Sequence, residues 1–128
     1  MMKRILIAED KASSRELLRT VLEQQGYEVV EAHDGEEALE KVRKEQLNLV
    51  LLDLQMPVRD GYEVVQEIRN DDRLSALPVI ALTANAMPED RERVMSAGFT
   101  SYVSKPVALA ELRAEIARLL QDEQNKGK

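Results

Sequence analysis

The stretch Leu49-Val50-Leu51-Leu52-Asp53 decides the fold, because four apolar residues lead directly into one acid. A short apolar run of this length is typical of a buried strand, so Asp53 is expected at the C-terminal tip of a strand. Residues 5–8 likewise lead into Glu9-Asp10, residues 79–82 into Thr83, and residues 102–104 into Lys105-Pro106. Ligands of an open α/β sheet bind in the crevice outside the carboxyl ends of its strands, so these side chains should converge on one site.

Short apolar runs alternate with longer amphipathic stretches along the chain, which is the pattern of βαβ units and a parallel sheet. The pattern predicts an α/β, (βα)5 fold with a doubly wound five-stranded parallel sheet. The strands are expected at about residues 4–8, 28–32, 49–53, 78–82 and 101–104. The helices are expected at about residues 14–25, 34–45, 62–69 and 88–97, with a last helix that carries apolar residues from 109 to 120.

The first helix has sequence signals at both ends. Ser13 and Glu16 have the spacing of a capping box, and Gly26 should stop the helix. Its inward stripe is expected to consist of Leu17, Leu18, Val21 and Leu22.

The helix at residues 88–97 is nearly all polar and carries only Val94 and Met95 as large apolar residues. Weak apolar anchoring should let this helix shift at low cost. Its charged residues 91–93 would by default form a solvated face.

Length and composition indicate one domain, residues 1–121, followed by a polar tail, residues 122–128. No apolar run approaches the ~20 residues of a membrane-spanning helix, and residues 1–8 are typical of a first strand rather than a signal peptide, so a cytoplasmic protein is expected. The net charge of −6 and the 3% aromatic content argue against nucleic-acid binding. Without cysteine, a metal must be held by oxygen ligands or by His33, which has no partner histidine and is expected on the surface.

The strand-end residues have the chemistry of phosphoryl transfer. Glu9, Asp10 and Asp53 would repel one another unless a cation neutralised them, and hard oxygen ligands suit Mg²⁺. Lys105 supplies a charge for phosphate oxygens and Thr83 a hydroxyl donor. Asp53 would then be the nucleophile.

These motifs, taken in order along nearly the whole chain, resemble the receiver domain of two-component response regulators. The pattern consists of Glu9-Asp10, Asp53 with Met56-Pro57 and Asp60-Gly61, Thr83-Ala84, and Lys105-Pro106. The resemblance implies a flavodoxin-like fold with strand order 2-1-3-4-5.

The resemblance also implies roles for single residues. Asp53 corresponds to the phosphoacceptor, which takes its phosphoryl group from a kinase phosphohistidine. Asp10 and Asp53 correspond to direct Mg²⁺ ligands, Glu9 to a ligand acting through water, and Gln55 to the backbone carbonyl ligand. Lys105 matches the cation that contacts the phosphoryl oxygens.

Further positions match the family's switch. Thr83 and Tyr102 correspond to the pair in which the hydroxyl moves to the phosphoryl group and the ring turns inward. Ala84 matches the small residue whose backbone N–H meets a phosphate oxygen. Pro106 matches a proline that usually follows a cis peptide bond.

Some positions depart from the family's pattern. Lys11 stands where many relatives carry an aspartate or asparagine, which places a cation near the rim of the metal site. Val58-Arg59 replaces a commoner apolar-methionine pair, which could change partner contacts. The segment at residues 81–86 is similar to receivers of hybrid kinases and to cell-cycle single-domain regulators, which favours a relay role.

The leading hypothesis is a phospho-accepting switch without an output domain, which catalyses only its own phosphorylation and slow autodephosphorylation. Its expected partners are a sensor histidine kinase or histidine phosphotransfer protein and a downstream protein that binds the face formed by the fourth helix, fifth strand and fifth helix. Neither nucleic acid nor membrane is expected as a partner. The expected state is a monomer or a weak, phosphorylation-dependent dimer.

Two alternatives remain at this point. Phosphatases of the haloacid-dehalogenase type also use a strand-end aspartate with Mg²⁺, but carry a second aspartate two residues later, where this chain has Gln55. A receiver that only binds partners without phosphorylation is disfavoured by the complete set of acids, threonine and lysine.

Overall fold

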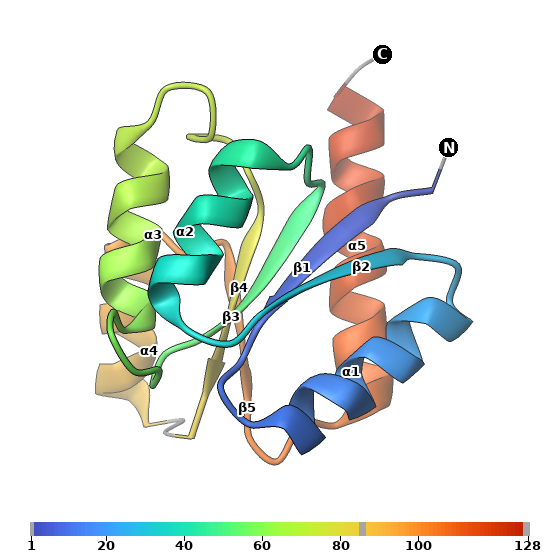
Figure 1. Cartoon of the computed structure of the whole chain (residues 1–128), viewed down its shortest axis with the longest axis horizontal. Coiled ribbons are helices and arrows are strands. Elements are labelled where there is room, and N and C mark those ends of the chain that lie inside the picture. Colours follow the sequence, from blue (N-terminus) through green and yellow to red (C-terminus); the bar gives the residue numbers. More distant parts are fainter. Residues whose placement is uncertain (1, 85–86, 127–128) are drawn as a thin grey trace.

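The computed structural model describes the backbone of residues 2–84 and 87–126, and side chains as far as residue 121. Strands and helices alternate along this part of the chain (Figure 1). The strands are β1 (Arg4–Ala8), β2 (Glu28–Ala32), β3 (Leu49–Asp53), β4 (Val79–Thr83) and β5 (Ser101–Ser104). The helices are α1 (Ala12–Gln24), α2 (Gly35–Lys44), α3 (Gly61–Asn70), α4 (Pro88–Ala97) and α5 (Leu109–Lys126).

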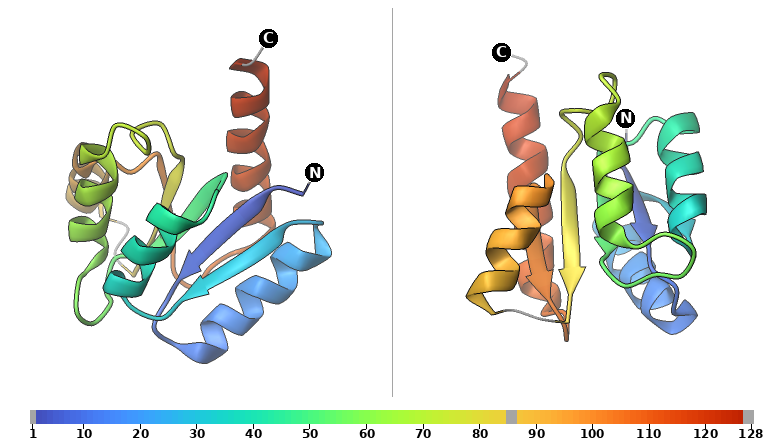
Figure 2. Two further views of the ribbon diagram at one scale, coloured as in Figure 1. Left: turned by 45° about the horizontal axis from the view of Figure 1, so that its top comes forward. Right: turned by 90° about the vertical axis from the view of Figure 1, so that its left-hand side faces the viewer.

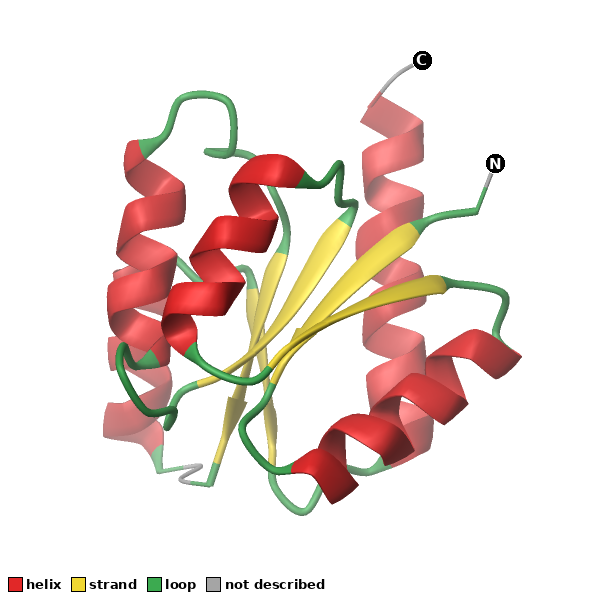
Figure 3. Cartoon of the chain, viewed as in Figure 1, coloured by secondary structure: helices red, strands yellow, loops and turns green. Residues whose placement is uncertain are grey.

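All five strands run parallel in one sheet, in the order β2-β1-β3-β4-β5. The predicted doubly wound parallel sheet and the strand order implied by the resemblance are therefore confirmed. Helices α1 and α5 cover one face of the sheet and α2, α3 and α4 cover the other (Figure 3). The strands β1 and β4 flank β3, so the C-terminal tips of these three strands are neighbours.

Two apolar cores lie on the two faces of the sheet, and alternate residues of β3 enter them. Val50 and Leu52 pack with the α2, α3 and α4 side, whereas Leu49 and Leu51 pack with α1 and α5. Every residue of β3 is buried. Burial on both faces explains why this strand is continuously apolar rather than alternating.

Helix α1 differs from its prediction. It begins at Ala12 with Lys11 at the N-cap position and without a side-chain cap, so the predicted capping box of Ser13 is wrong. Ser13 therefore lies inside the helix, and the Arg15 guanidinium donates to the backbone carbonyl of Glu9 over 2.9 Å, which joins the first turn of the helix to the end of β1. Leu17 is 54% exposed, so the inward stripe is narrower than expected.

The other helix ends follow the sequence signals more closely. The carboxylates of Asp34 and Asp60 cap α2 and α3, and Gly98 ends α4 in the left-handed conformation at φ 113°. Helix α5 continues to Lys126, past residue 121. The division into a domain, residues 1–121, and a tail, residues 122–128, stays a prediction.

Helices α4 and α5 lie on either side of β5, the last strand of the sheet (Figure 2). The helices in the described ranges 2–84 and 87–126 include none with the length and apolar character that crossing a bilayer requires.

Candidate functional site

The tips of β1 and β3 bring three acids together. One carboxylate oxygen from each of Glu9, Asp10 and Asp53 lies within 4.8 Å of the others. The carboxyl groups of Glu9 and Asp53 are buried, with residue exposures of 1% and 3%, whereas Asp10 is exposed. The site therefore combines two buried acids with one solvent-facing acid.

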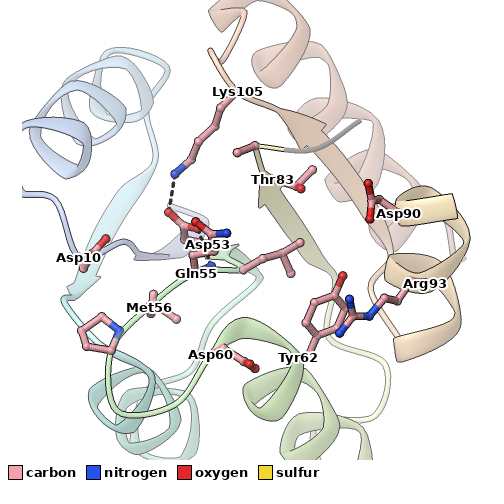
Figure 4. Close-up of a pocket in the computed structure, with 13 residues that line it drawn as sticks. Asp10, Asp53, Gln55, Met56, Asp60, Tyr62, Thr83, Asp90, Arg93 and Lys105 are labelled. Carbon is pink, nitrogen blue, oxygen red and sulfur yellow. Dashed lines mark hydrogen bonds and ion pairs between the residues drawn. The ribbon is translucent and has the colours of Figure 1, made fainter. Parts of the chain in front are cut away.

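Lys105 reaches this cluster from the end of β5. Its Nζ lies 2.5 Å from Asp53 Oδ2 (Figure 4) and 3.3 Å from Glu9 Oε2. Its backbone N–H donates to the carbonyl of Thr83 over 2.7 Å, which fixes the lysine beside the tip of β4. The Lys105–Pro106 peptide bond is cis, which is the form that the resemblance implied.

The backbone after Asp53 shapes the other side of the site. The N–H of Gln55 donates to Asp53 Oδ1 over 2.9 Å. Helix α3 then starts against the strand tip: a Cβ added to Gly61 would lie 2.6 Å from the carbonyl oxygen of Asp53. Only glycine permits this approach, which holds α3 directly against the site.

Glu9 is the acid whose protonation the site changes most. Burial raises its pKa to about 7, and the hydrogen bond and negative charge of Asp53 act in the same direction. Lys105 lowers the pKa of Glu9, but by less. Near neutral pH, the metal-free site therefore holds a proton on a substantial share of Glu9 side chains.

Asp53 and Lys105 form an ion pair. Burial alone would raise the pKa of Asp53, but hydrogen bonds from Glu9, Lys105 and the Gln55 N–H outweigh it and hold this pKa below its ordinary value. Burial likewise would lower the pKa of Lys105, but Asp53 and Glu9 together raise it. Asp53 is thus a carboxylate anion, the form needed for nucleophilic attack.

The donor set of the site fits Mg²⁺. Carboxylates and carbonyls are the hard oxygen ligands that this ion takes, usually with several waters retained. Two of the acids are buried against each other with one lysine as their cation, so a further cation would relieve their repulsion.

Thr83, Ala84 and Tyr102 occupy the β4 and β5 side. Thr83 is 5% exposed and lines the site together with Ala84. Tyr102 lies opposite Ala81 in the strand register and is half-buried, with the Arg91 guanidinium carbon 5.1 Å from its ring centroid. Residues 85 and 86 of the relay-like segment lie outside the described residues.

The departures from the family's pattern lie at the rim. Lys11 is exposed. Val58 is 72% exposed and has a left-handed φ of 72°. Arg59 Nε lies 3.0 Å from a Glu36 carboxylate oxygen, and its Nη1 lies 4.0 Å from Glu67, so it joins the surfaces of α2 and α3. Exposed ion pairs of this kind contribute little stability.

His33 lies outside the site. Its side chain is 62% exposed, and its Nδ1 lies 2.5 Å from a Glu37 carboxylate oxygen. The prediction of a surface residue is confirmed.

A pocket of about 650 Å³ opens above the acids, and it contains residues that the sequence did not single out for the site. Tyr62 from α3 and Asp90 and Arg93 from α4 line it together with Asp53 and Lys105 (Figure 4). Tyr62 directly follows the glycine that lies against Asp53, and this position was the one sequence signal that could have identified it.

Known proteins share both this sequence pattern and this fold. The family model of the response regulator receiver domain matches residues 5–117. The polar-differentiation response regulator DivK of Brucella anthropi is 38% identical over 122 residues, which cover 95% of this chain and 99% of DivK.

Two solved structures are also similar. The chemotaxis response regulator CheY4 of Vibrio cholerae is 31% identical, with a TM-score of 0.88 over 93% of this chain and 99% of that one. The receiver domain of a sensor histidine kinase from Pseudomonas aeruginosa is 34% identical, with a TM-score of 0.87 over 94% and 99% of the two chains, and holds a magnesium ion in its active-site cleft.

The acids, the threonine and the lysine lie at the tips of the strands around one site, and the family match covers nearly the whole chain. Together these observations exclude the haloacid-dehalogenase type of phosphatase. The chain belongs to the response regulator receiver domain family, the phospho-accepting switches of two-component signalling.

Proposed function

We propose that Asp53 accepts the phosphoryl group from the phosphohistidine of a sensor histidine kinase or a histidine phosphotransfer protein. The observation that carries the proposal is the buried Asp53 carboxylate, 2.5 Å from the Lys105 ammonium at the floor of an open pocket. A low pKa keeps this carboxylate ionised, and the pocket gives a donor access to it.

The transfer is a displacement at phosphorus. A carboxylate oxygen of Asp53 forms the new O–P bond, while the P–N bond to the donor imidazole breaks and its electron pair stays on the nitrogen. Lys105 passes from the free carboxylate to a phosphoryl oxygen, as a charged donor can. The hydroxyl of Thr83 and the backbone N–H of Ala84 donate to the remaining phosphoryl oxygens.

Asp10, Asp53, the Gln55 backbone carbonyl and, through water, Glu9 would hold Mg²⁺. When bound, the ion neutralises negative charge on the acids and on the incoming phosphoryl group. Glu9 must give up its proton to serve the cation, because only the carboxylate carries the negative charge that attracts the ion and its bound water.

Replacing the nucleophile tests this assignment. After incubation with acetyl phosphate and Mg²⁺, intact mass should show one phosphoryl adduct in the wild type and none in Asp53→Asn. Asp60→Asn is the matched control, because Asp60 lines the same pocket but lies at the start of α3. An adduct that persists in Asp53→Asn would place the phosphorylation elsewhere.

The metal assignment has its own test. Mg²⁺ should raise the melting temperature, since an ion that binds only the folded state stabilises it by about 2.7 kcal/mol at a hundredfold excess over Kd. Asp10→Asn should stabilise the metal-free protein and reduce the response to Mg²⁺. A full Mg²⁺ response in this variant would remove Asp10 from the ligand set.

The phosphorylated form should be read by a downstream protein on the face of α4, β5 and α5. Thr83 would move toward the phosphoryl group, and Tyr102 would turn into the space it leaves, which shifts the balance between two states of this face. A difference of a few kcal/mol between the states is sufficient. The half-buried state of Tyr102 supports this proposal, because its side chain is neither fully exposed nor fully packed in the core.

Beryllofluoride with Mg²⁺ stands in for the phosphoryl group and should shift amide NMR signals at Thr83, Tyr102 and residues 91–95. Thr83→Ala should retain Asp53 labelling but reduce the distant shifts. Shifts confined to the acid cluster, or unchanged in Thr83→Ala, would contradict the switch.

The proposal includes slow autodephosphorylation of Asp53 but no turnover of external phosphate esters, because Gln55 stands where the dehalogenase-type phosphatases carry their acid. It also includes residence in the cytoplasm, a relay role, and a monomer or weak phosphorylation-dependent dimer. Sedimentation with and without beryllofluoride tests the oligomeric state.

A further inference from the structure

The pocket above Asp53 is lined by more acids than bases. Its charged lining residues are Asp10, Asp53, Asp60, Asp90, Arg93 and Lys105. Lys105 already contacts two carboxylates, Asp53 and Glu9. A phosphodonor is itself an anion, so it approaches a surface on which Arg93 is the one lining cation not paired with a carboxylate among the described residues.

Arg93 is held in place by an aromatic ring. Its guanidinium carbon lies 4.5 Å from the centroid of the Tyr62 ring (Figure 4), and that ring packs edge-on against Phe99 at 6.1 Å. Phe99 is only 3% exposed, so the ring rests on a buried base. A ring contact uses the face of the guanidinium and leaves N–H donors at its edge for an anion.

A second arginine on the same helix provides a contrast. Arg91 lies over Tyr102 at 5.1 Å, compared with 4.5 Å for Arg93 over Tyr62. Both residues are exposed, and both belong to α4. Only Arg93 is among the residues that line the pocket. The two arginines therefore share helix, charge and type of contact but differ in access to the reacting centre.

We propose that Arg93 determines which small phosphodonors the site accepts, favouring acyl phosphates, whose leaving group departs as an anion. This inference rests on the proposed phosphorylation of Asp53. With an acyl phosphate, the Asp53 O–P bond forms and the P–O bond to the acyl group breaks. The electron pair stays on that oxygen, so a carboxylate leaves without a proton. Arg93 can donate to this carboxylate from across the pocket.

A nitrogen donor makes a different demand on the pocket. In phosphoramidate the nitrogen already carries the proton, so breaking the P–N bond releases neutral ammonia. The phosphoryl group transferred to Asp53 is the same in both reactions. The charge of Arg93 therefore matters more for the acyl phosphate, and the ratio of the two rates isolates its contribution.

The test compares initial rates of Asp53 labelling by acetyl phosphate and by phosphoramidate, with saturating Mg²⁺ and equal ionic strength, read by intact mass. Arg93→Gln should slow acetyl phosphate about threefold to tenfold, because one charge supplies only part of the roughly 10- to 10³-fold that a whole charged cleft can add, and should change phosphoramidate less than about twofold. Arg91→Gln should change neither rate, and Arg93→Lys should restore most of the acetyl phosphate rate. Raising the salt concentration should shrink the difference.

The outcomes separate this inference from the function on which it rests. Absence of Asp53 labelling in the wild type by either donor would overturn the proposed phosphorylation. Normal wild-type labelling, with Arg93→Gln slowing both donors equally or neither, would overturn the role of Arg93 and leave the phosphorylation intact. Asp90→Asn offers an independent check, because removing a pocket acid should accelerate acetyl phosphate more than phosphoramidate, and the reverse order would contradict the charge argument.

Discussion

Helices α3 and α4 are both ten residues long, lie on the same face of the sheet and line the same pocket, yet they are attached differently. Helix α3 buries four residues, Gly61, Val64, Val65 and Ile68, whereas α4 buries only Val94. Asp60 caps the start of α3 with its side chain, and α4 starts without such a cap.

The difference shows how one pocket can be lined by one fixed helix, α3, and one movable helix, α4. Gly61 holds α3 against the backbone of Asp53, so α3 cannot shift without disturbing the nucleophile. Helix α4 is instead held by guanidinium groups: Arg93 on Tyr62 of α3, and Arg69, whose Nε donates to the carbonyl of Gly98 over 2.7 Å. Such contacts bury little apolar area, so moving α4 costs less free energy.

The largest expected effect contrasts the apolar anchoring of the two helices. Ile68→Ala should lower the free energy of unfolding by about 3 kcal/mol, because it removes a fully buried side chain and leaves a cavity. Met95→Ala, at a position 45% exposed on α4, should change it by less than about 0.5 kcal/mol. Urea unfolding followed by circular dichroism measures both. Equal losses would mean that the two helices are anchored alike.

The next effect should act on Glu9, in the acid cluster, and not on α4. The folded protein holds Glu9 at a pKa of about 7, against an ordinary value of 4.5, so it binds more protons than the unfolded chain between these values. The free energy of unfolding of the metal-free protein should therefore fall as pH rises through this window, by up to about 3 kcal/mol.

Glu9→Gln should abolish this fall and leave the variant more stable than the wild type at pH 8. Urea titrations at several pH values in the presence of a chelator measure the trend. Hydrogen exchange of the α4 amides, corrected for the intrinsic effect of pH, should have the same pH dependence in the wild type and in Glu9→Gln. A stability that rises between pH 5 and 7 would contradict the raised pKa.

A smaller effect concerns the cap of α3. Asp60→Ala should cost about 1 kcal/mol, because the N–H of Glu63 loses the acceptor that it now reaches over 3.0 Å. Asp60→Asn keeps an acceptor and should cost much less, so it controls for the loss of charge. Thermal unfolding of the two variants distinguishes them, and equal losses would attribute the effect to charge instead of capping.

The smallest expected effect gives α4 the cap that it lacks. Met87 occupies its N-cap position without a side-chain hydrogen bond and is 60% exposed. Met87→Ser should stabilise the protein by about 0.5 kcal/mol and slow amide exchange in the first turn of α4. A destabilised or faster-exchanging variant would show that capping does not limit this helix.

Local sequence signals located most elements because each boundary depends on residues close to it. Pro88 and Gly98 set the limits of α4 as expected, since proline suits the first helical turn and Gly98 adopts the left-handed conformation. The start of α1 was misjudged because Ser13, a good cap by type, is already inside a helix that Arg15 ties to the end of β1. The structure, not the residue type, decided that boundary.

The sequence by itself determined that the acids, Thr83 and Lys105 meet at one edge of the sheet, because apolar runs define parallel strands whose carboxyl ends share that edge. Only the tertiary structure decided that Glu9 is buried and its neighbour Asp10 exposed, since adjacent residues beyond a strand differ in direction and not in type. It also decided that Arg93 lies on Tyr62. That contact joins two helices about thirty residues apart in the chain, and it depends on how both pack on the sheet, which no local pattern records.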